Sequence, residues 1–425
     1  MLRLPRSLCC PLALLIGSAL ALLPAVAAAE EFAPVDTPGS KPTITAAQAE
    51  SVIGCSAGFD QAETIPVLLI QGTGATAKDN WSWTYQPALD KLGIPWCHVD
   101  LPDQATGDVQ LNGEYVLQAL RSMHQTTGTR VSIIGHSQGG MVGRWALRWW
   151  PDSRAIVDDV IGFAPSNHGT TMARCSASDP CSPSGWQQRD EADFMRALNS
   201  RQETFAGVSY TNIYTRTDEI VQPNLDDSGS SSLRTGDGEI TNVATQDVCP
   251  TAVNEHLLIG LIDPVAYALA IDALINPGPA DPSRVPLTTC AQIFHPGIDP
   301  VTGPIAGAEA ADSYLSYEAE SVPAEPALAC YTTASCQPRG RDRDCVAERQ
   351  LRIKLRPLRA VRITLGGEPS ERIAVERRRG RLVVALDLRG YRERVAVLRV
   401  RGENRSGEAV KLVRRYRVCG APGPG

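Results

Sequence analysis

The sequence has few histidines, no double Cys-x-x-Cys pattern and, after residue 29, no apolar run that looks long enough to cross a bilayer. Six histidines in 425 residues leave few candidates for a general base. Paired Cys-x-x-Cys spacings are typical of zinc sites, so we expect no metal, and we expect no cofactor. A membrane-spanning helix needs about 20 apolar residues, so we expect no transmembrane span in the mature chain.

The beginning of the chain has the features of a secretory signal. Arg3 and Arg6 precede an apolar stretch at 8–23, and three alanines at 27–29 give the small-x-small pattern that signal peptidase cleaves. We therefore expect a signal peptide at residues 1–29 and a secreted protein, either extracellular or associated with the cell envelope. Ten cysteines follow this segment, and an even number in an exported chain indicates a disulfide framework.

Charge is divided unevenly along the chain. Residues 339–419 contain 24 Lys and Arg against 10 Asp and Glu, a net charge of +14, whereas the whole chain has −6. The remainder therefore carries −20, and such a change of sign marks a domain boundary. The segment 322–326, Val-Pro-Ala-Glu-Pro, has the composition of a linker. We predict one domain at 30–325 and an Arg-rich, disulfide-closed β-domain at 326–425.

Hydrophobic patterning gives the two domains different fold classes. The first alternates predicted strands with predicted helices, which indicates an α/β fold with a mostly parallel sheet and helices on both faces. Its strands are expected at 65–70, 96–99, 131–135, 160–163 and 208–214, and its helices at 80–92, 114–124, 141–149 and 265–274. After residue 345 apolar residues alternate with polar ones, which predicts a small antiparallel all-β domain. Its strands are expected at 351–355, 361–365, 382–388, 395–400 and 410–413.

The run 131–140, Val-Ser-Ile-Ile-Gly-His-Ser-Gln-Gly-Gly, places Gly-x-Ser-x-Gly between an apolar strand and a helical segment. That context is typical of a nucleophile elbow. Gly135 and Gly139 lack a Cβ, so strand and helix can approach closely around Ser137. The sequence predicts Ser137 as a nucleophile; the alternative is an ordinary turn with a capping serine.

A serine nucleophile needs a base and an orienting acid, and in this architecture the chain order is Ser, acid, His. His256, at the start of an apolar helical segment, fits that order better than His295 in a Pro-Gly-rich loop or His168 one strand after the elbow helix. The alternative for His256 is a solvated helix cap. Asp218 follows a predicted strand and is the expected acid, and spacing separates it only weakly from Glu219.

Together these segments resemble the Candida antarctica lipase B family of α/β-hydrolase lipases. The resemblance rests on Pro-Val-Leu-Leu-Ile-Gln-Gly-Thr-Gly-Ala-Thr from 66, Ser-Gln-Gly-Gly from 137, Phe-Ala-Pro from 163 and the quite specific Thr-Asp-Glu-Ile-Val-Gln-Pro from 217, in matching order across about residues 50–290. It implies the α/β-hydrolase fold and favours Asp218 over Glu219. It implies these site residues: Ser137 as nucleophile, Asp218 as acid, His256 as base, and an oxyanion hole from the backbone N–H and hydroxyl of Thr73 and the backbone N–H of Gln138.

Five disulfides are expected. The resemblance implies Cys55–Cys97 and Cys249–Cys290. Cys175 and Cys181 bracket an insertion and are expected to pair with each other. A Cys345–Cys419 bond would tie the ends of the β-domain, where closing a long loop removes most entropy from the unfolded chain. Cys330 and Cys336 then remain for each other.

The chain departs from the family at three places. His136 stands before the nucleophile, where the protein that gives the family its name has Trp, and this leaves the alcohol preference open. Ser166 follows Phe-Ala-Pro where the family has Asp. The basic β-domain has no counterpart in the protein that gives the family its name. Its charges either are solvated edge-strand residues that block sheet pairing or bind anionic envelope polymers or lipid head groups.

We therefore expect a monomeric, secreted serine ester hydrolase of the lipase type. It would act on triacylglycerols or related carboxylic esters through an acyl-enzyme. The alternatives are a short-chain carboxylesterase or polyester hydrolase and, from another class, an inactive hydrolase-fold protein that binds the envelope. The intact Ser-Asp-His order argues against inactivity, and export argues against nucleic acid as a partner.

Overall fold

The computed structural model describes residues 32–335 and, beyond them, 345–346, 350–355, 358–365, 369–378, 381–388, 395–403 and 409–418. The signal peptide expected at 1–29 lies outside the described residues.

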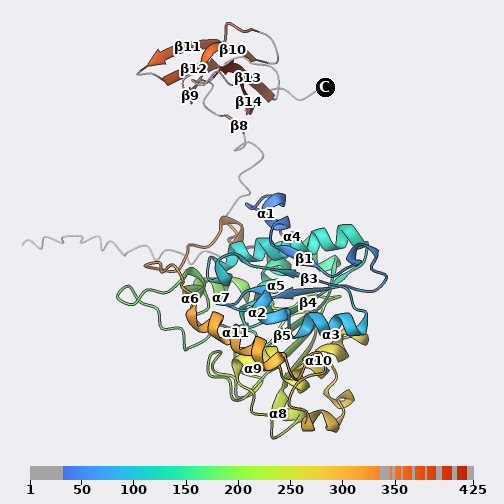
Figure 1. The fold of residues 1–425 in the computed structure, drawn as a ribbon. Helices are drawn as coiled ribbons and strands as arrows, with labels where there is room; N and C mark the ends of the chain where they lie inside the picture. The colour runs from blue at the N-terminus through green and yellow to red at the C-terminus, as the bar shows by residue number, and fades with distance from the viewer. Residues whose placement is uncertain are drawn as a thin grey trace, which may run out of the picture.

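The larger body is built on a seven-stranded sheet in the order β1-β3-β2-β4-β5-β6-β7 (Figure 1). Every neighbouring pair is parallel except β1 with β3. The strands are β1 (Ile53–Cys55), β2 (Val67–Ile70), β3 (Trp96–Val99), β4 (Val131–His136), β5 (Val157–Phe163), β6 (Ser209–Tyr214) and β7 (Glu239–Ala244). The expected α/β fold with a mostly parallel sheet is confirmed, and sequence patterning missed the two edge strands.

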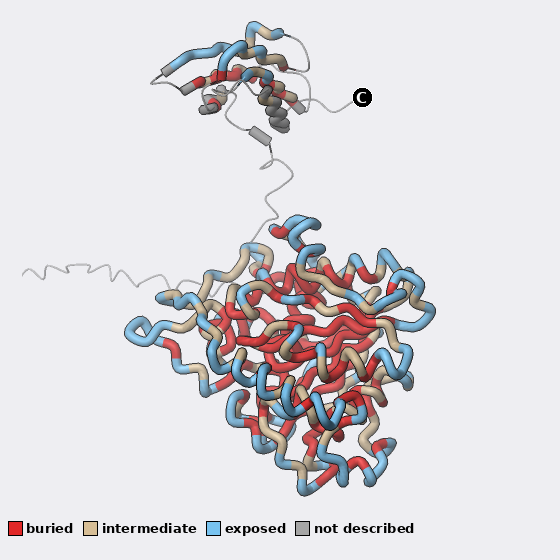
Figure 2. Tube along the Cα trace, in the orientation of Figure 1, coloured by how far each residue is buried: buried red, intermediate tan, exposed pale blue. Residues whose placement is uncertain are grey.

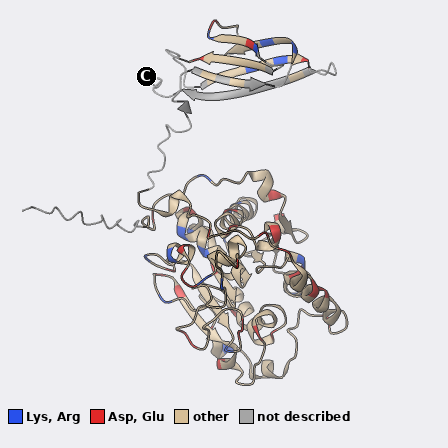
Figure 3. Ribbon diagram, turned by 90° about the vertical axis from the view of Figure 1, so that its left-hand side faces the viewer, with Lys and Arg blue, Asp and Glu red and all other residues tan. Residues whose placement is uncertain are grey.

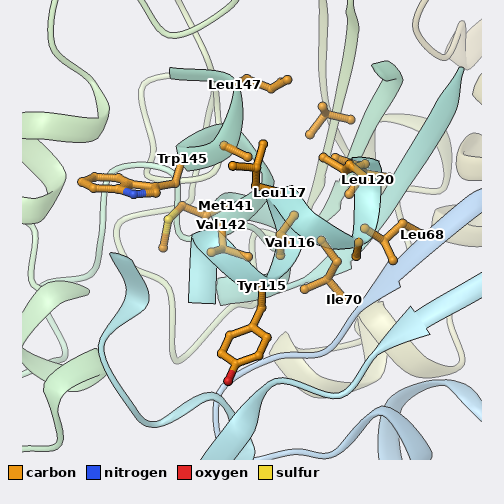
Figure 4. Close-up of a cluster of buried hydrophobic side chains, with 14 of the residues drawn as sticks. Leu68, Ile70, Tyr115, Val116, Leu117, Leu120, Met141, Val142, Trp145 and Leu147 are labelled. Carbon is orange, nitrogen blue, oxygen red and sulfur yellow. The ribbon is translucent and has the colours of Figure 1, made fainter. Parts of the chain in front are cut away.

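Helices cover both faces of this sheet. They are α1 (Ala46–Glu50), α2 (Ala77–Trp81), α3 (Tyr85–Leu92), α4 (Val109–Thr127), α5 (Gln138–Trp149), α6 (Pro183–Gln187), α7 (Asp193–Leu198), α8 (Thr245–Val248), α9 (His256–Leu261), α10 (Pro264–Ile275) and α11 (Gly303–Ser316). Successive residues of β2 point to opposite faces. Leu68 and Ile70 pack with α4 and α5, as Figure 4 shows, whereas Val67 and Leu69 pack with α2, α3 and α10. A strand buried on both sides explains the unbroken apolar run, and Figure 2 shows the buried central sheet.

Local capping sets where helices begin and end. Asp108 accepts the backbone N–H of Gln110 at the start of α4, and Gly128 ends that helix with φ 71°. The single helix expected over 80–92 is instead two, α2 and α3. The Thr84 hydroxyl donates to the Asn80 carbonyl in the break between them, which diverts the chain from one continuous helix.

One segment after residue 29 is long and apolar enough to cross a membrane by length and composition alone, which the sequence patterning did not anticipate. His256–Ile275 passes that test with a mean hydropathy of 1.9. The structure breaks this segment into α9 and α10, where Asp263 accepts the N–H groups of Val265 and Ala266 and starts a new helix. Over half of the segment, 56%, is buried within the protein, because α10 packs on the sheet.

The C-terminal part forms two small sheets, β10-β13-β14-β8 and β11-β12-β9. Their strands are β8 (Cys345–Val346), β9 (Gln350–Leu355), β10 (Arg359–Leu365), β11 (Ile373–Arg378), β12 (Arg381–Asp387), β13 (Val395–Glu403) and β14 (Ala409–Val418). Residues of both sheets, including Ile353, Val384 and Leu398, share one apolar core. The pairing is antiparallel as expected, with one exception: β8 runs parallel to β14, which places Cys345 opposite Arg417.

The structure forms three of the expected disulfides, Cys55–Cys97, Cys175–Cys181 and Cys249–Cys290. Cys330 is disulfide-bonded. The expected pairs Cys330–Cys336 and Cys345–Cys419 each include a cysteine, Cys336 or Cys419, that lies outside the described residues.

The segment after residue 325 still packs on the larger body. Trp145 Nε1 donates to Tyr331 Oη at 3.1 Å, and the Tyr331 ring lies 5.0 Å from that of Trp150. Thr333 forms a β-bridge with Phe32. The boundary expected between 325 and 326 therefore falls inside a packed segment, because Tyr331 completes a cluster of aromatic rings.

Candidate active site

Ser137 stands between β4 and α5 at the carboxyl edge of the sheet. Its φ of 55° and ψ of −121° lie outside the regions that residues with a side chain usually adopt. A Cβ on Gly135 would lie 2.2 Å from the carbonyl of Gly139, and one on Gly139 would lie 2.2 Å from the Ile70 oxygen. Both glycines are therefore required for the tight strand-to-helix turn that presents the Ser137 hydroxyl.

His256 and Asp218 line up behind this hydroxyl. His256 Nε2 lies 3.0 Å from Ser137 Oγ, and His256 Nδ1 lies 3.0 Å from Asp218 Oδ2. The His256 and Asp218 side chains are 2% and 0% exposed. Because a carboxylate only accepts, Nδ1 carries the proton and Nε2 accepts from the serine. The structure thus brings together the three residues that the sequence nominated.

Asp218 is held by its own turn. Its Oδ1 accepts the N–H groups of Ile220 and Val221 at 3.0 and 2.7 Å. Glu219 turns to the other side and accepts the backbone N–H of His256 at 3.3 Å. The carboxylate beside the imidazole is therefore that of Asp218.

The other two histidines considered as bases lie elsewhere. His168 Nε2 lies 2.5 Å from Glu203 Oε1. Burial alone would raise the pKa of Glu203, but the hydrogen bond from His168 and the positive charge of Arg144 lower that pKa to about 2. His295 is buried against Tyr267, with ring centroids 4.7 Å apart, and burial lowers its pKa to about 4. His168 and His295 therefore have structural contacts of their own, with Glu203 and Tyr267, and neither is hydrogen-bonded to Ser137.

Thr73, on the exit loop of β2, receives two hydrogen bonds at its hydroxyl. Gln138 Nε2 and Gln188 Nε2 each lie 2.9 Å from Thr73 Oγ1. The Gln138 amide is oriented by the Ala105 carbonyl, which accepts from Nε2 at 3.0 Å. The Gln188 amide is oriented by Ser166, which donates to Oε1 at 2.9 Å. With both lone pairs engaged, the Thr73 hydroxyl can only donate onward.

Gln138 is the first residue of α5, so its backbone N–H has no acceptor within the helix. This N–H and the Thr73 hydroxyl are both donors beside Ser137, at the positive end of a helix. They are two of the three oxyanion donors that the resemblance implies, the third being the backbone N–H of Thr73.

A cavity of about 610 Å³ opens over Ser137 and His256. Its walls are mainly apolar and come from segments far apart in the chain: Trp83, Met172, Ile220, Leu257, Leu261, Phe294, Ala310, Tyr314 and Tyr317. Helix α11 forms one wall and is fixed to α2 by Ser313 Oγ, which donates to Asp79 Oδ2 at 3.0 Å.

Sequence reasoning missed part of this site. The resemblance covered about residues 50–290, whereas Tyr314 and Tyr317, beyond that stretch, line the cavity. It also passed over Gln188. The Gly-Pro at 303–304, which suits the start of a helix, could have signalled α11 but not its position over Ser137. Within the described residues, no group of three or more His, Cys, Asp or Glu is arranged to hold a metal.

Residues 64–256 match the family model of class 2 lipases. Together with the relatives described next, this match confirms the family expected from the sequence. The matched segment belongs to the class 2 lipase family. It contains Ser137, Asp218 and His256, whereas α11 lies beyond it.

Two relatives agree with the class 2 lipase assignment. Lipase B of Pseudozyma antarctica is 32% identical over 225 residues, which cover 51% of this chain and 65% of that protein. The chain thus matches slightly less than two thirds of that relative's length. The crystal structure of Aspergillus fumigatus lipase B aligns with a TM-score of 0.63 at 29% identity, covering 72% of this chain and 76% of that one.

Proposed function

We propose that this protein is a serine ester hydrolase of the lipase type. The observation that carries the proposal is the hydrogen-bonded line from Ser137 through His256 to Asp218 at the base of an apolar cavity. Membership of the class 2 lipase family supports it.

The proposed reaction assigns a role to each group of the site. Ser137 Oγ attacks the ester carbonyl while His256 Nε2 takes its proton, and Asp218 orients the imidazole and stabilises its positive charge. The Thr73 hydroxyl and the Gln138 backbone N–H donate to the oxyanion. His256 then protonates the leaving alcohol, and an acyl-enzyme remains. Water, deprotonated by the same imidazole, attacks the acyl carbonyl; the imidazolium then returns the proton to Ser137 Oγ as the carboxylic acid leaves.

The cavity supports esters of apolar acids as the substrate class. Its volume of about 610 Å³ falls within the range of small-molecule sites, and Leu257, Leu261 and Phe294 are apolar walls. Burying each methylene of an acyl chain against such walls contributes about 0.8 kcal/mol. We therefore favour a triacylglycerol lipase over a short-chain esterase.

Hydrolysis of p-nitrophenyl esters from C2 to C16 by the purified protein tests this proposal. We expect kcat/KM to rise from C2 toward medium or long chains, and Ser137→Ala to remove the activity and labelling by a fluorophosphonate probe. Absence of hydrolysis and labelling in the unmodified protein would contradict enzymatic function. A maximum at C2 would favour the short-chain esterase.

We propose that the protein is secreted and that its C-terminal sheets form a domain that binds anionic surfaces. The disulfides are consistent with an oxidising compartment. Arg362 and Arg401 are cross-strand partners on β10 and β13, and both are exposed. Figure 3 marks the described Lys and Arg of the C-terminal sheets in blue. Adjacent cations on one sheet face attract anionic head groups or polymers.

Co-sedimentation of the full chain with phosphatidylglycerol vesicles tests the binding. We expect binding at low salt that weakens at high salt, because salt screens exposed charges. The Arg362→Gln/Arg401→Gln variant should bind more weakly and hydrolyse soluble esters normally. Equal binding to neutral phosphatidylcholine vesicles would contradict a charge-based surface.

A further inference from the structure

A buried hydrogen-bond chain joins the two halves of the candidate site. Asn80 Oδ1 accepts the backbone N–H of Gly72, the residue before Thr73, at 2.9 Å. Asn80 Nδ2 lies 3.4 Å from His136 Nδ1. His136 Nε2 lies 2.9 Å from the backbone carbonyl of His256. These hydrogen bonds connect the loop that carries Gly72 and Thr73, here called the oxyanion loop, to the backbone of His256, and they pass the nucleophile on the way. The two side chains that make them, Asn80 and His136, are called the bridge below.

The chemistry of the end groups fixes the direction of every bond. The His256 carbonyl can only accept, so His136 carries its proton on Nε2. His136 Nδ1 then accepts from the Asn80 amide, which leaves the Asn80 oxygen for the Gly72 N–H. All three bonds are satisfied at once only when His136 is neutral.

The surroundings keep His136 neutral. Burial, and then repulsion from His256, lower the pKa of His136 to about 3. Asn80 and His136 are 3% and 2% exposed. The bridge therefore adds no charge beside His256, whose own positive charge develops during the reaction.

The fold makes room for this imidazole. A Cβ on Gly260, one turn after His256 on α9, would lie 2.3 Å from His136 Cδ2. The His136 and His256 rings are 5.2 Å apart and tilted by 35°. A larger residue at 260 would force a shift of either this imidazole or α9, which carries His256.

We propose that Asn80 and His136 are positioning residues that hold the oxyanion loop and the backbone of His256 in a fixed relation to Ser137. The proposal rests on the proposed ester hydrolysis. Asn80 and His136 form this bridge through their own side chains. Its effect is on geometry, because neither side chain needs to exchange a proton.

The first test is His136→Phe, which keeps a planar ring and removes both hydrogen bonds. We expect kcat on p-nitrophenyl butyrate to fall on the order of 10- to 100-fold, because small displacements of catalytic groups are costly, with KM changed less than about twofold. Asn80→Leu keeps the branched shape and removes the hydrogen bonds of the Asn80 side chain to Gly72 and His136. If the residues act as one unit, the double variant should be little worse than His136→Phe alone.

Two further variants separate positioning from general stability. His136→Gln retains an amide donor for the His256 carbonyl and should recover part of kcat. Trp81→Phe alters the same short helix as Asn80 without touching the bridge, and should change thermal stability more than kcat. Where His136→Phe fails to fold, Asn80→Leu alone decides the question.

A folded His136→Phe or Asn80→Leu protein with unchanged kcat would overturn the proposal. So would losses that follow melting temperature equally across these variants and Trp81→Phe. If the unmodified protein hydrolyses no ester, the proposed function is wrong, and the proposed role of Asn80 and His136 is wrong with it. Activity that is lost in Ser137→Ala but retained in both bridge variants refutes the bridge alone.

Discussion

The Thr73 hydroxyl offers the sharpest test of the oxyanion site. It accepts hydrogen bonds from the Gln138 and Gln188 amides at 2.9 Å each, so its proton is directed away from both. Thr73→Val keeps the shape and the backbone donor and removes only this hydroxyl. We expect kcat to fall on the order of 10²- to 10³-fold, the usual effect of losing one oxyanion donor, with KM nearly unchanged.

Thr73→Val should also lower the free energy of unfolding, but by less than the free energy that corresponds to the loss of kcat. Gln138 Nε2 keeps the Ala105 carbonyl at 3.0 Å, whereas Gln188 Nε2 keeps only the Ser184 carbonyl at 3.4 Å. A weakly satisfied amide costs about 1–2 kcal/mol, which is too little to explain the loss of kcat by unfolding. The two effects are therefore separable.

Steady-state hydrolysis of p-nitrophenyl butyrate gives kcat and KM, and urea unfolding gives stability. Thr73→Ser is the matched control, since it keeps the hydroxyl, and it should retain most of kcat. A Thr73→Val protein with unchanged kcat would mean that the hydroxyl does not face the oxyanion. A large rise in KM with unchanged kcat would assign Thr73 to substrate binding instead.

Three further outcomes are expected. Ser137→Ala and His256→Ala should each abolish nearly all ester hydrolysis and their combination should be little worse, whereas His168→Ala should remain active; substantial activity in His256→Ala would refute the base. Burial, opposed by a hydrogen bond from a serine, raises the pKa of Asp159 from 3.8 to about 7. The contribution of Asp159 to the free energy of unfolding is therefore full below about pH 4 and is lost as pH rises through 7. Between pH 5 and pH 8, the free energy of unfolding of Asp159→Asn, measured in urea, should rise relative to that of the unmodified protein by on the order of 2–4 kcal/mol. A gain that does not depend on pH would contradict this. Tyr331→Ala should cost about 2–4 kcal/mol in the same assay by emptying its place among the tryptophans, and no loss would show that the segment adds no stability.

The sequence by itself identified the features that depend on neighbouring residues. A tight strand-to-helix turn needs glycines two positions before and two positions after Ser137, so the five residues from Gly135 to Gly139 are enough to predict the nucleophile elbow. Period-two alternation likewise marked most strands of the C-terminal sheets. The nominations of Asp218 and His256 rested on chain order and family resemblance, and the hydrogen-bond geometry agrees with both.

Only the tertiary structure decided which distant segments meet. Ser313 and Asp79 are 234 residues apart in the chain, and Trp145 and Tyr331 are 186 apart, yet each pair is in hydrogen-bond contact. No local periodicity records such pairings, because they arise when separate elements bury their faces against one sheet. The wall of the cavity made by α11 and the packing of Tyr331 on the larger body were therefore invisible in the sequence. So was the bridge through Asn80 and His136, since its three bonds need the ends of two strands and two short helices at one place.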